Sequence, residues 1–363
     1  MSAFSIVDEG ALSHQPGKGC FIPHIAALSD GGFVGANQVG SDLSARDHHA
    51  ELYRSSDGIH WETMKNFPLS EIQQRWGYHS IQVYEMGNRW IVRATRYNHQ
   101  AYSDQRADGG SSGPVILTTD DEGKHWSEPR YVPAPLDPGE YTHHSMGNVI
   151  AFDDQHWFFP VQLNNPSTHK GPNHHGAARL ITEDGGESWE DFGIVAQDPD
   201  GKIEYHDQFG VQLSDGKLYT MLWTIDTEAN RDLPNHYVIS EDQGRSWTPP
   251  RSTNIPGQVC APILLKDGRI AAIYNDRKEP QGIRLALSED REHFDVENAF
   301  TVHDAGNEAT TGEAEDDHFL SMNEKIAFGR PNGTVLGDGT VLVFFWCTIE
   351  GVTHTRWTKI AVA

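Results

Sequence analysis

The sequence predicts an all-β fold, a six-bladed β-propeller of four-stranded antiparallel blades whose ring is closed by an N-terminal strand. Three observations lead to this prediction. A turn motif built on aspartate, glycine and tryptophan repeats along the chain, and a second Asp-Gly hairpin motif repeats between its copies. The last repeat also lacks one strand, which the N-terminal segment can supply.

The first motif, here called the Asp-turn motif, reads Ser/Thr-x-Asp-x-Gly-x-x-Trp and separates two apolar, strand-like runs. Glycine supplies a positive φ and aspartate accepts hydrogen bonds from nearby amides, so the pattern indicates a hairpin. Full copies surround Asp121, Asp184 and Asp242, a shorter form surrounds Asp57, and a degenerate form surrounds Asp290. The aspartates are roughly 50 to 65 residues apart, a period typical of propeller blades or another repeat array.

The second motif is a tight hairpin flanked by alternating apolar residues. It occurs at residues 28–31, 213–216, 265–268 and 336–339, with equivalents at 84–88 and 152–155. Two-residue Asp-Gly connections are strong hairpin signals. The six hairpins predict six blades.

The blades are expected to form a single domain over residues 1–363, because each blade needs its neighbours to bury its faces. The repeats place the blades at about 15–66, 74–132, 140–194, 202–252, 257–299 and 326–363. The last of these lacks a strand, and about residues 1–10 would complete it and remove the free edges of the sheet.

Composition narrows the class of partner. The net charge is −24, with 52 acidic against 28 basic residues, and such a surface repels nucleic acid and anionic membranes. Three cysteines give no disulfide framework, and neither a signal peptide nor a membrane-spanning run is visible. We expect a cytoplasmic protein, or a secreted one if a signal was trimmed, that acts on a small molecule or an oligosaccharide; its oligomeric state stays open.

The Asp-turn motifs, the six-unit period and the segment Phe21-Ile22-Pro23 resemble the sialidase superfamily of six-bladed propellers. The resemblance covers nearly the whole chain. It implies a propeller with the Asp-turn motifs at its periphery and a carbohydrate-active site elsewhere. The fold also hosts arabinanases, lyases and binding proteins, so the resemblance alone does not give the activity.

The catalytic positions of that family are only partly kept. Phe21 stands where sialidases have an arginine that grips the substrate carboxylate, and Asp47 matches the acid/base aspartate. Counting back from the hairpins, Asp207 takes the place of the glutamate that partners the nucleophile, and Arg330 takes the place of the nucleophilic tyrosine. The resemblance therefore implies a sialidase-like protein that does not cleave sialic acid.

Residues at the starts of the innermost strands and the ends of the second strands should surround the centre of the ring. In chain order they are His24, Asn37, Asp47, His48, Tyr78, His79, Arg96, Tyr141, His143, His144, Gln162, Asn164, Glu204, Tyr205, His206, Asp207, Trp223, Gln258, Tyr274, Asn275, Arg277, Arg330 and Trp346.

Within this set we expect catalytic residues and substrate-binding residues. The catalytic candidates are Asp47, Asp207, His206, Tyr205, His144 and His79. The substrate-binding candidates are Arg96, Arg277, Arg330, His24, His143, Tyr78, Gln162 and Trp223. Imidazoles suit proton transfer near neutral pH, and guanidinium groups suit a carboxylate or sulfate. The repeated Tyr-His and His-His pairs could also reflect repeat ancestry alone, and Trp223 could simply pack between blades.

Three functions are compatible with these residues. The leading hypothesis is a glycoside hydrolase acting on an acidic, uronic-acid-containing oligosaccharide, with Asp47 as general acid and Asp207 as base or nucleophile. The alternative is a polysaccharide lyase with a histidine or tyrosine base and an arginine that neutralises the carboxylate. The third is a non-catalytic glycan-binding propeller. No cofactor is expected; a metal ion is the minority alternative, because the chain has no HxH or HExxH spacing.

Overall fold

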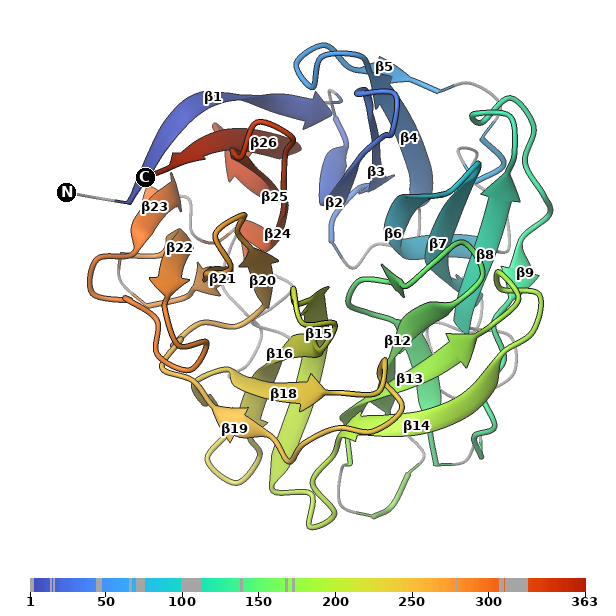
Figure 1. Cartoon of the computed structure of the whole chain (residues 1–363), viewed down its shortest axis with the longest axis vertical. Coiled ribbons are helices and arrows are strands. Elements are labelled where there is room, and N and C mark those ends of the chain that lie inside the picture. The colour runs from blue at the N-terminus through green and yellow to red at the C-terminus, as the bar shows by residue number, and fades with distance from the viewer. Residues whose placement is uncertain are drawn as a thin grey trace.

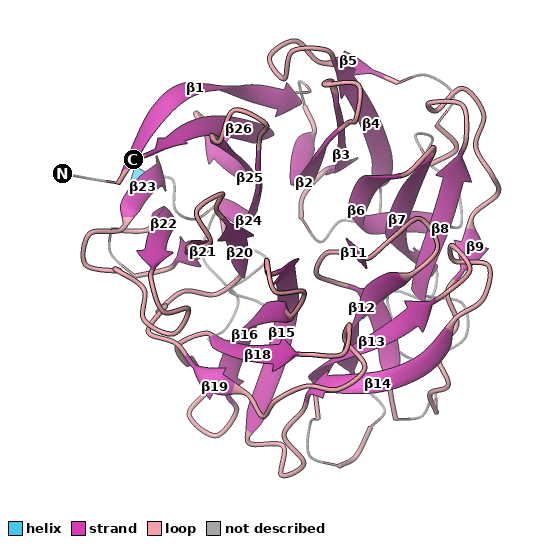
Figure 2. Cartoon of the chain, viewed as in Figure 1, coloured by secondary structure: helices cyan, strands magenta, loops and turns pink. Residues whose placement is uncertain are grey.

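The computed structural model shows six antiparallel sheets arranged as blades around a common axis (Figure 1). It describes residues 3–13, 15, 17–43, 48–64, 67–69, 76–98, 113–137, 140–166, 169–171, 174–278, 280–306, 310 and 326–363. These residues form strands and loops, apart from one short 3-10 segment at Gly306 (cyan in Figure 2), and contain no α-helix. The predicted all-β, six-bladed propeller is confirmed. No helix in the described ranges is long and apolar enough to span a membrane.

The first three blades follow one another along the chain, each running from the centre of the ring to its rim. Blade 1 contains β2 (Gly19–Ala27), β3 (Phe33–Gly40), β4 (His49–Ser55) and β5 (Glu62–Thr63). Blade 2 contains β6 (Trp76–Met86), β7 (Arg89–Asn98), β8 (Gly113–Thr119) and β9 (Arg130–Tyr131). Blade 3 contains β10 (Thr142–Ser145), β11 (Ile150–Ala151), β12 (Trp157–Asn164), β13 (Gly176–Thr182) and β14 (Glu190–Ala196).

The remaining blades complete the ring. Blade 4 contains β15 (Ile203–Gln212), β16 (Leu218–Asp226), β17 (Arg231–Asp232), β18 (His236–Ser240) and β19 (Arg251–Ser252). Blade 5 contains β20 (Cys260–Leu264), β21 (Ile270–Asp276), β22 (Gly282–Ser288) and β23 (Phe300–Asp304). Blade 6 contains β24 (Phe328–Val335), β25 (Val341–Ile349), β26 (Val352–Val362) and β1 (Phe4–Ser13).

The N-terminal strand closes the ring. β1 is the outermost strand of blade 6 and pairs antiparallel with β26, from Phe4 opposite Val362 to Ser13 opposite Thr355 (Figure 1). This pairing places both ends of the described chain in one blade and covers an edge that would otherwise expose unpaired amides. The predicted closure by an N-terminal strand is confirmed.

The hydrophobic core lies between neighbouring blades. One cluster joins Ile263 and Ile273 of blade 5 to Val343 and Phe345 of blade 6, and all four side chains are buried. Burying one such side chain contributes about 1.5–3 kcal/mol. A single blade would leave these faces in water, so every blade depends on its neighbours.

The Asp-turn motifs form turns near the rim, joining the third and fourth strands. In blade 3 the hydroxyl of Thr182 donates to Oδ1 of Asp184 (2.8 Å) and accepts from the amide of Gly186 (2.9 Å). The same Oδ1 accepts from the amide of Ser188 (2.9 Å). Gly186 has φ 81, a conformation that L side chains rarely adopt. The aspartate therefore satisfies the turn's own amides.

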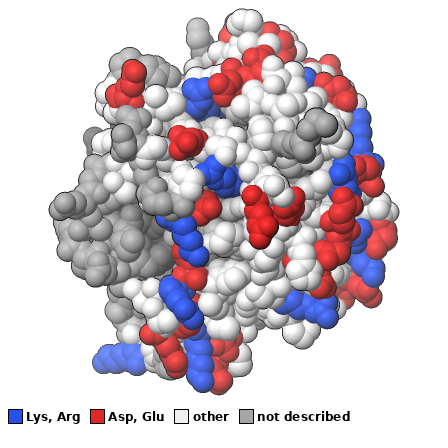
Figure 3. All heavy atoms as spheres, turned by 90° about the vertical axis from the view of Figure 1, so that its left-hand side faces the viewer, with Lys and Arg blue, Asp and Glu red and all other residues white. Residues whose placement is uncertain are grey.

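Acidic and basic side chains interleave over the face shown in Figure 3. Some of these side chains form exposed ion pairs, such as Lys359–Asp338 (2.8 Å) and Arg269–Asp267 (2.6 Å). Exposed pairs of this kind contribute at most about 1 kcal/mol each. The ion pair at the centre of the ring, between Asp207 and Arg330, differs from them because both of its side chains are largely buried.

Replacing Asp184 by alanine should lower the free energy of unfolding by about 1–2 kcal/mol, because the Ser188 amide and the Thr182 hydroxyl lose their acceptor. Urea unfolding followed by circular dichroism measures the change. The control is Asp154→Ala, which removes an exposed carboxylate in the same blade. Equal effects of the two substitutions would contradict the role assigned to the motif.

Candidate functional site

The innermost strands carry a repeated backbone irregularity at the centre of the ring. Four of them contain one non-glycine residue with a left-handed backbone: Ile22 (φ 50), Ser80 (φ 52), Asp207 (φ 48) and Arg330 (φ 50). The pairing register with the second strand shifts at each of these places. Such β-bulges redirect side chains. The bulges therefore mark equivalent positions in blades 1, 2, 4 and 6.

Glutamines on neighbouring second strands hold two of these bulges. Oε1 of Gln38 accepts from the amide of Ser80 (3.2 Å), and Oε1 of Gln162 accepts from the amide of Asp207 (3.2 Å). Both glutamine side chains are buried. A left-handed non-glycine residue costs about 1–3 kcal/mol, and these hydrogen bonds help to offset that cost.

An ion pair joins two of the bulges across the ring. Nη2 of Arg330 lies 2.9 Å from Oδ1 of Asp207, and the side chains are only 13% and 6% exposed. Nη2 of Arg330 also contacts Sδ of Met146 (3.0 Å), which accepts from the hydroxyl of Ser80 (3.5 Å). Blades 2, 3, 4 and 6 therefore meet through side chains at the centre.

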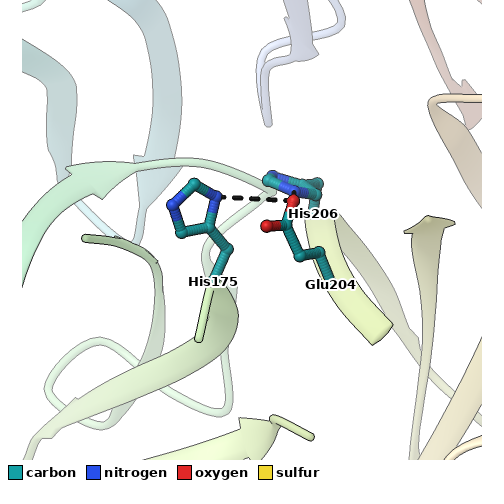
Figure 4. A group of neighbouring side chains, drawn as sticks. All are labelled: His175, Glu204 and His206. Atoms are coloured by element: carbon teal, nitrogen blue, oxygen red, sulfur yellow. Dashed lines mark hydrogen bonds and ion pairs between the residues drawn. The ribbon is translucent and has the colours of Figure 1, made fainter. Parts of the chain in front are cut away.

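Beside this pair, a carboxylate faces two histidines. Oε2 of Glu204 lies 3.1 Å from Nε2 of His206 and 3.5 Å from Nδ1 of His175 (Figure 4). Burial acts to raise the pKa of Glu204, but hydrogen bonds from His175 and His206 outweigh it and hold the pKa well below its ordinary value. Glu204 is therefore a carboxylate in the folded protein.

A hydrogen-bonded chain runs from blade 4 through blade 5 to blade 6. The indole of Trp223 donates to Asp232 (2.7 Å), which also accepts from Gln258 (3.1 Å). Gln258 in turn accepts from Nε of Arg277 (3.2 Å), and Nη2 of Arg277 donates to the carbonyl of Phe328 (2.8 Å). This series of hydrogen bonds holds Arg277 close to β24, the strand that carries Arg330.

The guanidinium of Arg277 lies in surroundings that disfavour a positive charge. Burial lowers its pKa to about 9, although the charge of Asp232 acts in the opposite direction. Its guanidinium lies 4.1 Å above the ring of Phe328, and Nη1 is buried with no hydrogen-bond partner in the described part of the chain. None of the described carboxylates forms an ion pair with it. An anionic ligand would supply the missing partner.

Residues 99–310 match the model of the BNR repeat-like domain family. The chain belongs to this family. Among curated proteins, no sequence matches the chain.

Solved structures resemble this BNR repeat-like protein over almost its whole length. A protein of unknown function from Dyadobacter fermentans has a TM-score of 0.77 at 17% identity, covering 100% of both chains. The intramolecular trans-sialidase of Ruminococcus gnavus has a TM-score of 0.64 at 12% identity, covering 98% of this chain and 96% of its own. Trypanosoma rangeli sialidase has a TM-score of 0.62 at 15% identity; the match covers 94% of this chain but 55% of that enzyme. These similarities confirm the sialidase-like fold expected from the sequence.

The structure brings together the two positions that the resemblance pairs. Asp207 and Arg330, which counting from the hairpins matches to a sialidase glutamate and its partner tyrosine, have side chains in contact in this BNR repeat-like protein. Asp47, the candidate general acid, lies outside the described residues.

The repeated Tyr-His and His-His pairs are split by the strand geometry. Neighbouring residues of a strand point to opposite faces, so only one member of each pair can face the centre. Tyr78, His143 and Tyr205 are buried, whereas His79, His144 and His206 are half-buried.

The buried members, two substrate-binding candidates and the catalytic candidate Tyr205, lie within the fold. Tyr78 belongs to a core cluster between blades 1 and 2, and burial raises its pKa. His143 contacts the carbonyl of Val132 (3.1 Å), and burial lowers its pKa. Burial raises the pKa of Tyr205 to about 12, with a contribution from the charge of Asp198, so Tyr205 is a poor catalytic base.

Two other substrate-binding candidates also support the fold. His24 is buried between Tyr84 and Phe344, with ring centroids 4.8 Å and 5.5 Å away. Gln162 holds the Asp207 bulge, and its Nε2 donates to the carbonyls of Gly176 and Tyr205 (3.0 Å each).

The half-buried candidates keep polar contacts. Nε2 of His79 lies 2.8 Å from Nδ1 of His48, and Nε2 of His144 lies 3.3 Å from the Thr142 hydroxyl. Arg96 stacks over Trp76 at 4.5 Å, and its Nε has no hydrogen-bond partner among the described residues.

Three residues of the site were missed by sequence reasoning: His175, Asp232 and Met146. His175 had a usable signal, since His174-His175 precede the third strand of blade 3 as His48-His49 begin that of blade 1. Asp232 and Met146 lie outside the long strands on which the counting rested, and they had no such signal.

Substituting Arg330 by methionine should destabilise the protein by about 3–5 kcal/mol, because the buried Asp207 carboxylate loses its partner. Urea unfolding gives the difference. The double variant Asp207→Asn/Arg330→Met should recover part of the loss. As a control, Arg269→Met breaks an exposed pair and should cost less than about 1 kcal/mol; a similar loss for both arginines would contradict the assignment.

His24 should make the protein less stable in acid. Burial and the charge of Arg93 lower its pKa from 6.5 to about 3 in the folded protein, and its Nδ1 accepts from the amide of Val83. Unfolding lets the ring take up a proton, so stability is lost as pH falls from about 6.5 to about 3, by up to about 1.4 kcal/mol per pH unit.

The measurement for His24 is the free energy of unfolding from pH 7 to pH 4, in the wild type and in His24→Asn. The difference between the two should shrink as the pH falls, because other titrating groups cancel in the comparison. A difference independent of pH would show that folding does not shift the pKa of His24, which would contradict the prediction.

Proposed function

We propose that this protein is a carbohydrate-active enzyme that hydrolyses a glycosidic bond in an acidic, uronic-acid-containing oligosaccharide. The observation that carries the proposal is Arg277, an enclosed guanidinium without a carboxylate partner among the described residues, in a chain with 52 acidic residues. A guanidinium binds a carboxylate through two parallel hydrogen bonds. The sialidase-like fold supports a glycan as the ligand.

In this proposal the reacting bond lies beside Asp207. Arg330 engages Oδ1 of Asp207 and leaves Oδ2 for a water molecule or the sugar. Asp207 then acts as base or nucleophile, Arg330 fixes its orientation, and Asp47 donates a proton to the leaving oxygen. Arg277 binds the sugar carboxylate nearby, because its Nη2 contacts the carbonyl of Phe328, two residues before Arg330.

One observation favours a second reaction, β-elimination by a lyase. The position of the tyrosine nucleophile holds an arginine, and Arg330 or Arg277 could neutralise the carboxylate while a base removes the proton next to it. The half-buried His79 and His144 are then the best candidates for the base, and the raised pKa of Tyr205 makes it a weaker one.

A panel of uronic-acid oligosaccharides separates these reactions. Hydrolysis produces new reducing ends and no unsaturated uronate. Elimination produces new reducing ends together with an unsaturated uronate, which absorbs ultraviolet light. Binding without any product would support a glycan-binding propeller and overturn the enzyme. Neither binding nor product with any acidic glycan would overturn the proposal as a whole.

Asp207→Asn should lower kcat by about 10²–10⁴-fold on the best substrate of the panel, as expected for loss of an acid–base or nucleophilic carboxylate. The control, Asp184→Asn, alters an Asp-turn motif at the rim and should leave kcat unchanged. Both variants are compared by thermal unfolding and assayed well below their melting temperatures. Unchanged turnover in folded Asp207→Asn would remove Asp207 from the mechanism.

A further inference from the structure

Two histidines and one carboxylate converge on a single point between blades 3 and 4. The ligand-type atoms of His175, Glu204 and His206 all lie within 4.8 Å of one another. Glu204 and His206 are two residues apart on β15, so their side chains share one face of the strand. His175 directly precedes β13 and faces them from the neighbouring blade (Figure 4).

The spacing of these atoms is close to that of a metal's ligands. Zinc binds histidine nitrogen and carboxylate oxygen at about 2.0–2.2 Å, which puts the ligand atoms of a tetrahedral site about 3.3–3.6 Å apart. Here Oε2 of Glu204 lies 3.1 Å from His206 and 3.5 Å from His175. Only small side-chain movements are needed to admit an ion.

The surrounding structure fixes the backbone that carries the three side chains. Gln162 donates to the carbonyls of Gly176 and Tyr205, and so ties the residue after His175 to the residue between the other two ligands. The amide of His174 donates to Asn165 (2.5 Å), and its carbonyl accepts from Gln197 (2.8 Å). Ligands held in place before the ion arrives lose little conformational entropy on binding.

The chemistry of the cluster suits a transition metal better than calcium or magnesium. Two imidazoles with one carboxylate are typical of zinc and other first-row metals, whereas the hard cations prefer oxygen ligands. The three side chains are 11–13% exposed, so they are largely shielded and still reachable from solvent. Three protein ligands also leave a position open for water or a substrate oxygen.

We propose that His175, Glu204 and His206 bind one divalent transition-metal ion, with Zn²⁺ as the best match. The site depends on this cluster alone and not on the reaction proposed above. Without an ion, the same contacts would be a hydrogen-bonded His–Glu–His network.

Titration calorimetry on the chelator-treated full chain tests the site directly, with ZnCl₂ as the ligand. We expect one tight site per chain, weakened by at least about tenfold in His175→Ala, because loss of a ligand exceeds the loss of a second-shell partner. The matched control is His60→Ala, which removes an exposed histidine paired with Asp57 (2.7 Å) at the rim and should leave the affinity unchanged.

A second readout covers the case in which His175→Ala does not fold. Co²⁺ added to the wild-type protein should give the visible absorption of a nitrogen- and oxygen-ligated ion, and Glu204→Gln should lose it. Equal Zn²⁺ affinity in wild type and His175→Ala would assign binding to other members of the chain's 20 histidines and overturn the site. Absence of a tight site in the wild type would leave the hydrogen-bonded network as the correct description.

Discussion

The ion pair between Asp207 and Arg330 is the interaction on which the centre of the structure depends. Its two members come from blades 4 and 6, which are not neighbours, so they meet only when the ring is closed. Both have a left-handed backbone at a β-bulge, and a charge at either position without the other would be costly to bury. The ion pair therefore depends on two other features: the closure of the ring by β1 and the bulges at Asp207 and Arg330.

The fold was predictable because its signals are local. Except for the degenerate copy around Asp290, each Asp-turn motif contains the hydroxyl, carboxylate and glycine that its own hydrogen bonds use, as Thr182, Asp184 and Gly186 show. The closing strand was predictable for a different reason: blade 6 lacked one strand, and residues 4–7 were apolar enough to supply it. Neither inference required knowledge of contacts between distant residues.

The site was only partly predictable. Counting from the hairpins located Asp207 and Arg330, because inner strands keep a fixed distance from their hairpins. The same counting could not tell which neighbour in a strand faces the centre, and Tyr78, His143 and Tyr205 proved to be buried in the fold. Asp232 lies between the second and third strands of its blade, where segment length varies from blade to blade, so no register leads to it; His175, just before a third strand, had a signal that the counting did not use.

The arrangement of charge links the fold to the proposed chemistry. The centre of the ring holds the paired carboxylate and guanidinium of Asp207 and Arg330, and Arg277 lies nearby without an anionic partner among the described residues. In the proposed reaction, such a centre would orient an acidic sugar beside Asp207, which would act as base or nucleophile.

The proposed hydrolysis is tested most directly by cleaving a uronic-acid oligosaccharide in heavy-oxygen water. Mass spectrometry of the products then shows where the heavy oxygen is incorporated. Hydrolysis by this protein should place one heavy oxygen atom at the new reducing end. Unsaturated products without heavy oxygen, or unchanged substrate across the whole panel, would contradict it.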